Sequence, residues 1–293
     1  MTLHPKVSVI LLNWNQYELT AACLNSLRRC TYPNIEMIVI DQASTDGSTE
    51  RLMINFPEIK LIANKKNTGF TGGNNQGMAV AKGEYFLLLN NDTVVHPSFL
   101  EPLVDALESD PDAAAASPLI RFFFAPTFIQ YAGGPEQIDL IRGRNTWRGW
   151  KTRIPHQYST VEKTSAAHGA AFMIKSSVVE RIGMLDEKLF IYYEEYDWSL
   201  RIRQAGYSIL FVPQSEILHK ESMTLTKDSP FRTKLMARNR LWLSKKYLPS
   251  YQHALSVAYV WFCSLPLNIA RYTFRRKFDL AKALFAGSLE GTF

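Results

Sequence analysis

The chain has 293 residues, of which 46% are hydrophobic and 20% are charged. This composition is typical of a globular protein, so it excludes a disordered or fibrous chain, and the length suits one large domain or two fused ones. Three cysteines without a CxxC pair favour reduced thiols and argue against a structural zinc site. No signal-peptide pattern precedes the first apolar run, so we expect a cytoplasmic location.

The net charge of +6 is unevenly distributed along the chain. Residues 231–293 contain 11 of the 33 basic residues but only 2 of the 27 acidic ones. A near-neutral body followed by a basic, aromatic tail indicates attraction to an anionic membrane surface. Nucleic acid is the alternative partner, but no nucleic-acid-binding motif supports it.

Apolar runs alternate with helical patterns through the first 110 residues. Such runs indicate strands buried on both faces, at residues 7–12, 35–40, 60–63 and 85–89. Helical spacing predicts helices at residues 17–29, 49–55, 74–81 and 96–107, and residues 67–73 are predicted as a loop rich in Gly and Asn. Alternating strands and helices favour βαβ units and a largely parallel sheet.

The periodicity weakens after about residue 113. Residues 122–158 are aromatic and glycine-rich, which predicts irregular strand and loop. Further strands are expected at residues 169–174, 208–212 and 216–219, and helices at residues 176–182, 194–204, 230–247 and 251–274.

Three of the predicted strands end in polar clusters. These clusters are Asn13-Trp14-Asn15, Asp41 followed by Asp46, and Asn90-Asn91-Asp92. In open α/β sheets, ligands bind beyond the carboxyl ends of the strands. The clusters therefore predict one ligand site at a shared edge of the sheet.

These segments, with the glycine-rich stretch at residues 67–77, follow the order and spacing of family 2 glycosyltransferases. The chain resembles that family over roughly residues 5–245, and most closely its rhamnosyltransferase-like subgroup. The resemblance implies an inverting enzyme with the GT-A fold, an α/β fold whose mixed, mostly parallel central sheet has helices on both faces, plus C-terminal helices. It divides the chain into a donor-binding half (1–120), an acceptor-binding half of the same domain (121–230) and C-terminal helices (231–293).

The resemblance places the nucleotide of a dTDP- or UDP-sugar at the strand ends. Asp41 is the family position that holds the base and ribose, and Asn13 and Asn15 belong to the same donor site. For Asp41 the alternative role is that of a turn or helix cap. For Asp46 this capping role and nucleotide binding are equally supported. Gly72 and Asn74 lie beside the donor in the family, although a plain turn before a helix explains their residue types nearly as well.

Asn90-Asn91-Asp92 resembles the DxD element that holds a divalent metal in the GT-A fold. Mg²⁺ or Mn²⁺ prefers oxygen ligands and neutralises a diphosphate leaving group. Asp92 is the expected carboxylate ligand, and Asn91 offers a weaker amide oxygen. His219 corresponds to a histidine that completes the metal or diphosphate site in many such enzymes, the alternative being an ordinary core histidine.

An acidic cluster precedes the helix predicted at residues 194–204 and resembles the acceptor side of the family. Glu195 is the first candidate for the base that takes the acceptor hydroxyl's proton, followed by Glu194 and Asp197. Repulsion among these carboxylates is expected to raise at least one pKa. Their alternative role is to stabilise a helix N-terminus, with Asp197 pairing to Arg201.

Residues 254–270 form a largely apolar stretch that Pro266 and Asn268 interrupt, and four basic residues follow it at residues 271–277. This pattern favours a helix on the membrane surface over a transmembrane span. Packing on the body of the protein and a contact in a homo-oligomer are the alternatives that the sequence leaves open.

Together these features predict metal-assisted, inverting transfer of a sugar, rhamnose or another hexose or deoxyhexose, to a hydroxyl of a lipid-linked glycan during cell-surface polysaccharide assembly. A nucleotidyltransferase would need a basic, glycine-rich loop after the first strand, where this chain has Asn13-Trp14-Asn15. A non-catalytic sugar-nucleotide-binding module is the other alternative. The carboxylates at residues 194–197 argue against it, since binding alone gains little from them.

Overall fold

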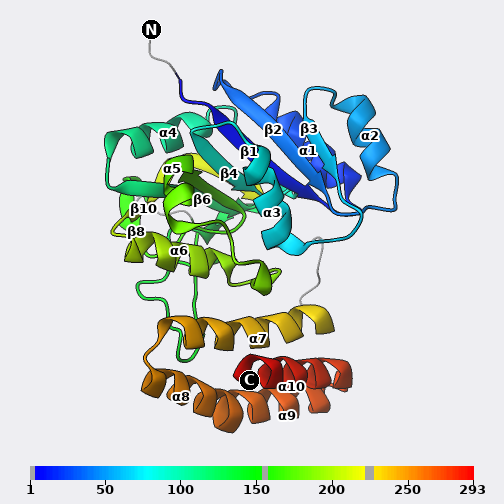
Figure 1. Ribbon diagram of the computed structural model, residues 1–293, viewed down its shortest axis with the longest axis vertical. Coiled ribbons are helices and arrows are strands. Elements are labelled where there is room, and N and C mark those ends of the chain that lie inside the picture. The colour runs from blue at the N-terminus through cyan, green and yellow to red at the C-terminus, as the bar shows by residue number, and fades with distance from the viewer. Residues whose placement is uncertain (1–3, 154–157, 222–227) are drawn as a thin grey trace. The chain divides into compact units, whose positions relative to one another are not determined.

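The computed structural model describes residues 4–153, 158–221 and 228–293, which form two compact units. The larger α/β unit comprises residues up to 136, 146–190 and 194–221, and the smaller helical unit comprises residues 137–145, 191–193 and the chain beyond 221. Each unit has its own arrangement of elements (Figure 1).

A ten-stranded sheet forms the centre of the α/β unit, in the order β3-β2-β1-β4-β9-β6-β10-β5, with β7 paired to β6 and β8 to β10. Its strands are β1 (Val7–Asn13), β2 (Ile35–Asp41), β3 (Lys60–Ala63), β4 (Tyr85–Leu89), β5 (Thr93–Val95), β6 (Ala113–Phe122), β7 (Ala125–Tyr131), β8 (Glu162–Thr164), β9 (Ala171–Lys175) and β10 (Ser208–His219). Strands β1 to β4 pair in parallel, and so do β6 and β10, whereas β9 runs antiparallel to both β4 and β6. The expected mixed, mostly parallel sheet is therefore confirmed.

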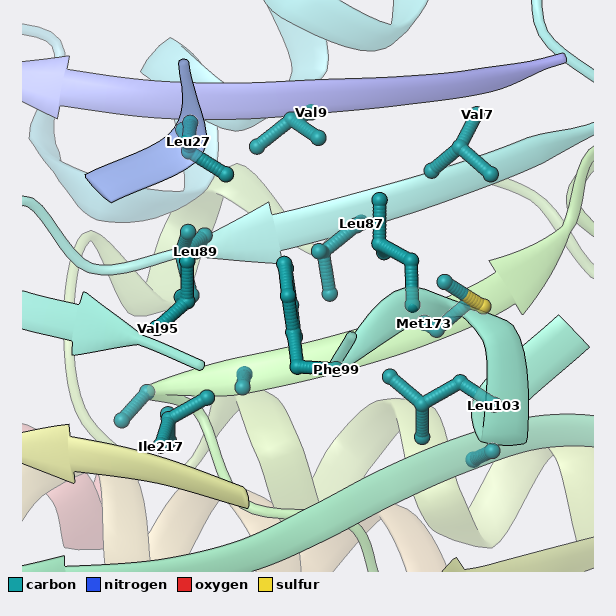
Figure 2. Close-up of a cluster of buried hydrophobic side chains, with 14 of the residues drawn as sticks. Val7, Val9, Leu27, Leu87, Leu89, Val95, Phe99, Leu103, Met173 and Ile217 are labelled. Atoms are coloured by element: carbon teal, nitrogen blue, oxygen red, sulfur yellow. The ribbon is translucent and has the colours of Figure 1, made fainter. Parts of the chain in front are cut away.

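Helices cover both faces of this sheet because the buried strands are apolar on both sides. They are α1 (Tyr17–Leu27), α2 (Ser48–Asn55), α3 (Gly69–Val80), α4 (Leu100–Ser109), α5 (Ser176–Ile182) and α6 (Glu194–Gln204), with a short 3-10 turn at Glu187–Leu189. Along β1, Val7 and Val9 face a core shared with α1, α2 and α4, and Ile10 faces a second core shared with α3, α5 and α6. Figure 2 shows the first of these cores, in which Phe99 lies among the strand residues.

The glycine-rich stretch is helical, which corrects the loop predicted for residues 67–73. Helix α3 begins at Gly69, so most of the stretch lies in its first turns. A Cβ on Gly73 would lie 2.0 Å from Gln42 Nε2, and one on Gly77 would lie 2.4 Å from Ile10 Cγ2. These glycines let the helix approach the sheet closely, and this packing outweighs the poor helix propensity of glycine.

Other predicted bounds also change. The weakly periodic region contains the ten-residue strand β6 and the strand β7, and the helix expected from residue 96 begins at Leu100, after the short strand β5. The two strands predicted at residues 208–212 and 216–219 form one strand, β10. Its register shifts between Val212 and Glu216, around Pro213, which has no N–H to donate.

The helical unit consists of α7 (Pro230–Tyr247), α8 (Ser250–Tyr259), a π-helical turn (Val260–Ser264), α9 (Leu265–Phe274) and α10 (Phe278–Thr292). Helix α10 was not among the predicted elements. Gly287 and Gly291 bring it against α7, since a Cβ on Gly287 would lie 2.1 Å from the carbonyl oxygen of Lys234. Among the described residues, one helix, Ser250–Phe274, is long and apolar enough to cross a membrane by length and composition, and 17% of its most apolar window is buried.

Candidate active site

The polar strand ends do meet at one edge of the sheet. Parallel pairing brings Asn13 opposite Asp41 at the carboxyl ends of β1 and β2. The chain leaves β4 at the same edge through Asn90, whose N–H donates to the carbonyl of Ala170 just before β9. Strand β10 is parallel to this group of strands and ends at His219, so His219 belongs to the same edge.

A continuous hydrogen-bonded relay joins Asp41 to Asn91 (called the relay below). Asn13 Nδ2 donates to Asp41 Oδ2 at 2.7 Å, and Asn13 Oδ1 accepts from Thr20 Oγ1 at 2.7 Å. Thr20 Oγ1 in turn accepts from Asn91 Nδ2 at 2.9 Å. All four side chains are at most 9% exposed. The relay fixes the predicted nucleotide carboxylate relative to the residue that precedes Asp92.

The turn after β2 is built around Ser44. Its N–H donates to Asp41 Oδ1, and its hydroxyl accepts from Asn13 Nδ2 and from the N–H of Asn15. Asn15 has φ 52° and accepts the N–H of Thr45 at 2.7 Å through Oδ1. Asp46 accepts the N–H of Ser48 at 3.0 Å, in the manner of a helix-capping carboxylate before α2. Asn15 and Asp46 thus shape the turn, and both are exposed at its surface.

Helix α3 holds Gly72 and Asn74 in buried positions. A Cβ on Gly72 would lie 2.9 Å from Thr68 Cβ, and Asn74 Nδ2 donates to the carbonyl of Phe70 within the helix. The contact to β2 is made by Gln42, whose Nε2 donates to the carbonyl of Gly69 and whose Oε1 accepts the N–H of Thr68. The start of α3 is therefore tied directly to the residue after Asp41.

Asp92 and His219 are brought together although 127 positions of sequence separate them. Asp92 Oδ1 lies 3.0 Å from His219 Nε2, and both side chains are buried. His219 Nδ1 lies 2.9 Å from Gln130 Oε1, an acceptor, so Nδ1 carries the proton. Nε2 is then the ring atom that faces the Asp92 carboxylate.

This pair suits a divalent cation. Adjacent ligands of an octahedral ion with bond lengths near 2.1 Å lie roughly 3 Å apart, and histidine ligands commonly donate their second N–H to a carbonyl-type oxygen, as His219 does to Gln130. Within the described ranges no group of three or more His, Cys, Asp and Glu side chains suits a metal. Asp92 and His219 would therefore supply two ligands, and donor oxygens and water would supply the others.

The acidic cluster begins helix α6. Glu194 is buried and Glu195 half-buried, and a Cβ on Gly169 would lie 3.9 Å from Glu194 Oε1 and 4.0 Å from Glu195 Cβ. Gly169 lies in the loop between His168 and β9, so both glutamates lie near the strand-end edge. Asp197 is 1% exposed and accepts from Arg201 Nε at 2.9 Å. Because Arg201 also donates to the carbonyls of residues 182 and 183, Asp197 anchors the helix.

Asn75, which was not among the predicted site residues, connects α3 to the acceptor-side segment. Its Nδ2 donates to the carbonyl of Leu185 at 2.9 Å, and its Oδ1 accepts the N–H of Leu185 at 3.0 Å. Nδ2 also lies 3.0 Å from Glu187 Oε1. Three further residues, Thr20, Ser44 and Gln130, also support the site and were not predicted as site residues. Of these three, Ser44 alone lies within a motif that the sequence analysis identified.

His168 is held neutral beside the candidate metal pair. Burial, and then the nearby ring of His219, lower the pKa of His168 to about 3. Its Nδ1 accepts the N–H of Ala170 at 3.0 Å, and its ring contacts Tyr131, Trp147 and His219 at centroid distances of 5.4, 5.0 and 6.2 Å. It therefore packs as an uncharged aromatic ring in the wall of the site.

This mixed, mostly parallel α/β sheet with helices on both faces is the GT-A fold of glycosyltransferases. Two solved structures share the fold. The first is GalNAc-T7 with UDP, GalNAc and Mn²⁺, which has a TM-score of 0.68 and 20% identity over 86% of this chain and 50% of that chain. The second is the mannosyltransferase PcManGT from Pyrobaculum calidifontis with GDP-Man and Mn²⁺, with a TM-score of 0.59 and 16% identity over 100% of this chain and 88% of that chain.

Sequence comparison identifies the family. The family model for glycosyl transferase family 2 matches residues 8–183, so the chain belongs to glycosyl transferase family 2. A relative in Mycobacterium tuberculosis, N-acetylglucosaminyl-diphospho-decaprenol L-rhamnosyltransferase, is 26% identical over 70% of this chain and 73% of its own length. The low-salt glycan biosynthesis hexosyltransferase Agl10 of Haloferax volcanii is 24% identical over 99% of this chain and 92% of its own length. The predicted family and fold are thereby confirmed.

Proposed function

We propose that this glycosyltransferase transfers a sugar, with inversion, from a dTDP- or UDP-sugar to a hydroxyl of a lipid-linked glycan. The sugar is rhamnose or another hexose or deoxyhexose, and the setting is cell-surface polysaccharide assembly at the cytoplasmic face of the membrane. The relay between Asp41 and Asn91 carries the donor half of this proposal, because it fixes a base-binding carboxylate relative to the DxD-like turn.

In this proposal different strand-end residues bind different parts of the donor. Asp41 accepts a hydrogen bond from the imide N–H of the base or from a ribose hydroxyl, and Asn13 holds Asp41 in place. Asp92 and His219 hold the divalent metal, Mg²⁺ or Mn²⁺. When bound, that ion neutralises charge on the departing diphosphate. Asn15, Asp46, Gly72, Asn74 and Asn91 shape the walls of the donor site.

Glu195 is the proposed base. Inversion requires a carboxylate on the acceptor side to take the proton of the attacking hydroxyl. Glu195 is half-buried at the first turn of α6, close to Gly169, whereas Asp197 is already paired with Arg201. Glu194, next to it and also near Gly169, is the second candidate.

A lipid-linked acceptor is supported by two observations. The rhamnosyltransferase relative is named for an acceptor carried on diphospho-decaprenol. The helical unit also exposes large apolar side chains together with basic residues, including Phe262, Phe274, Arg271 and Arg275. Such a surface favours association with an anionic membrane.

Calorimetric titration of UDP, dTDP and GDP, each with MnCl₂ or with EDTA, tests the donor assignment. We expect UDP or dTDP to bind in the presence of metal and Asp92→Asn to weaken this binding at least tenfold. Glu180→Gln, an exposed carboxylate on α5, is the matched control and should leave binding unchanged. Binding confined to GDP would overturn the role of Asp41.

Glu195→Gln separates catalysis from binding. We expect this variant to bind the donor like the unmodified chain while its transfer rate falls at least a hundredfold, as the loss of a general base predicts. Donor binding by the unmodified chain without turnover on any lipid-linked glycan would instead identify a binding module. Full transfer activity of Glu195→Gln would move the role of base to Glu194.

A further inference from the structure

A cavity of about 350 Å³ lies within the helical unit. Helices α7 and α10, the helix through residues 260–272, and the short segments at residues 143 and 193 all contribute to its wall. Its size falls in the range of pockets that bind small molecules. The family assignment does not explain it, because the matched family region ends at residue 183.

Two arginines, Arg232 and Arg240, line this cavity, and none of its described lining residues is acidic. Arg240 donates from Nη2 to the carbonyl of Ile141 at 3.2 Å, but its buried Nε has no hydrogen-bond partner among the described residues. Burial lowers the pKa of the Arg240 guanidinium, which nevertheless stays charged at neutral pH. A buried cation without a carboxylate beside it is costly unless an anion joins it.

Asp139 is the acidic residue that acts on Arg240, and it does so from outside the lining. Its Oδ1 already accepts the N–H groups of Ile141 and Arg142, at 3.0 and 2.7 Å. These hydrogen bonds hold the Asp139 carboxylate in its loop, so it does not act as the anionic partner within the cavity.

Ser288 gives a second, independent indication of a ligand. It lies on α10 in the cavity wall, is 1% exposed, and its Oγ has no partner among the described residues. The adjacent Gly287 lies so close to Lys234 that α10 is fixed against α7. The Ser288 hydroxyl is therefore held in the wall as an unused donor, and such buried polar groups normally have a partner.

The wall also contains apolar side chains, among them Val260, Leu265 and Leu284, beside the polar Thr233, Ser264 and Asn268. Val260 begins the π-helical turn and Leu265 directly follows it, and such turns often mark functional sites. The same helix exposes Phe262 by 82% and Leu267 by 69%. The cavity thus combines cationic and apolar side chains, and exposed apolar side chains lie on the same helix.

We propose that this cavity binds a phosphate ester carried on a hydrocarbon chain. Arg232, Arg240 and Ser288 hold the phosphate oxygens, and the apolar side chains of the wall contact the first carbons of the chain. Guanidinium groups suit this role because they bind phosphate through paired N–H donors. The identity of this ligand as the acceptor's lipid carrier rests on the proposed function.

Titration calorimetry of the full chain with monodecyl phosphate, below its micellar concentration, tests the proposal directly. Decyl glucoside, which has the same chain without the charge, and inorganic phosphate, which has the charge without the chain, form the other two arms. We expect monodecyl phosphate to bind at least tenfold more tightly than either.

Arg232→Gln and Arg240→Gln should each weaken the binding of monodecyl phosphate by about 10- to 100-fold, as expected for a lost hydrogen bond to a charged group. Arg29→Gln removes the same charge from an exposed position just after α1, outside the cavity lining and the exposed apolar surface, and should change the binding less than twofold. Thermal melting identifies any variant that fails to fold. Arg232 donates no hydrogen bond to the backbone of a described residue, which keeps the test valid if Arg240→Gln is unstable.

Three outcomes would overturn the proposal. Unchanged binding by both arginine variants would remove the phosphate site, and equal binding of decyl glucoside would reduce the cavity to an apolar groove. Equal binding of inorganic phosphate would leave the hydrocarbon chain without a role. Because no sugar donor enters this experiment, these outcomes leave the donor-binding and transfer tests untouched, and failure of those tests does not alter this one.

Discussion

Replacing Thr20 by valine breaks the relay at its centre while keeping the shape of the side chain. Asn13 Oδ1 then loses its donor and Asn91 Nδ2 loses its acceptor, both in buried positions. Each unsatisfied group costs about 1–3 kcal/mol, so we expect the free energy of unfolding to fall by about 2–6 kcal/mol. Thr20→Ser keeps the hydroxyl and loses one buried methyl group, which costs about 1 kcal/mol.

Urea unfolding of the two variants, followed by donor titration, checks this reasoning. Without the relay, valine should be the better tolerated residue, because it buries more hydrocarbon than serine. We expect the reverse order, with Thr20→Val less stable than Thr20→Ser and a dissociation constant for the donor nucleotide raised about tenfold, which corresponds to ~1.4 kcal/mol. Stability of Thr20→Val equal to or above that of Thr20→Ser would refute the role of the relay.

Three further predictions concern the surroundings of the site. Helix propensity alone would make Gly73→Ala stabilising by about 1 kcal/mol, but the added Cβ displaces the hydrogen-bonded Gln42, so we expect urea unfolding to show a net loss of about 1–3 kcal/mol. The exposed Ala79→Gly in the same helix is its control, and a stabilised Gly73→Ala would contradict the close approach. Asn75→Ala should lower the free energy of unfolding by about 2–4 kcal/mol, because both backbone groups of Leu185 lose their partner; an effect below 1 kcal/mol would count against this link. Burial raises the pKa of the Cys23 thiol from 9.0 to about 12, so the folded chain keeps a proton that the unfolded chain releases, and the resulting stabilisation is complete below pH 9 and is lost between pH 9 and 12. We expect this thiol to lower the free energy of unfolding, measured in urea, by about 1 kcal/mol between pH 9 and 10. Cys23→Ala should abolish this contribution.

The donor edge could be predicted from the sequence because parallel strands align their carboxyl ends. Continuous apolar runs located β1, β2 and β4, so Asn13, Asp41 and Asp92 were expected at one edge. The residues that connect them could not be predicted in the same way. Thr20 lies on the buried face of α1 outside any motif, and Gln130 lies in a stretch without periodicity, so only the folded chain brings them to the site.

The glycine-rich helices were misjudged for one physical reason. Glycine is a poor helix former, so local propensity favours a late start for α3 and gives little support to glycine-containing α10. In the structure their glycines lie where a side chain would collide with Gln42, Ile10 or the backbone of Lys234. Tertiary packing outweighs local propensity at these positions, and a single sequence does not reveal which neighbours demand the close approach.

The helical unit is assembled from three separate stretches of the chain, and this has a consequence for the order of synthesis. Tyr192 and Tyr193 have φ of 74° and 73°, a conformation that costs about 1–3 kcal/mol for each such residue. Asn239 compensates by donating to the carbonyls of residues 191 and 192. Because Asn239 is synthesised 46 residues after Tyr193, these two hydrogen bonds can form only once this part of α7 has left the ribosome.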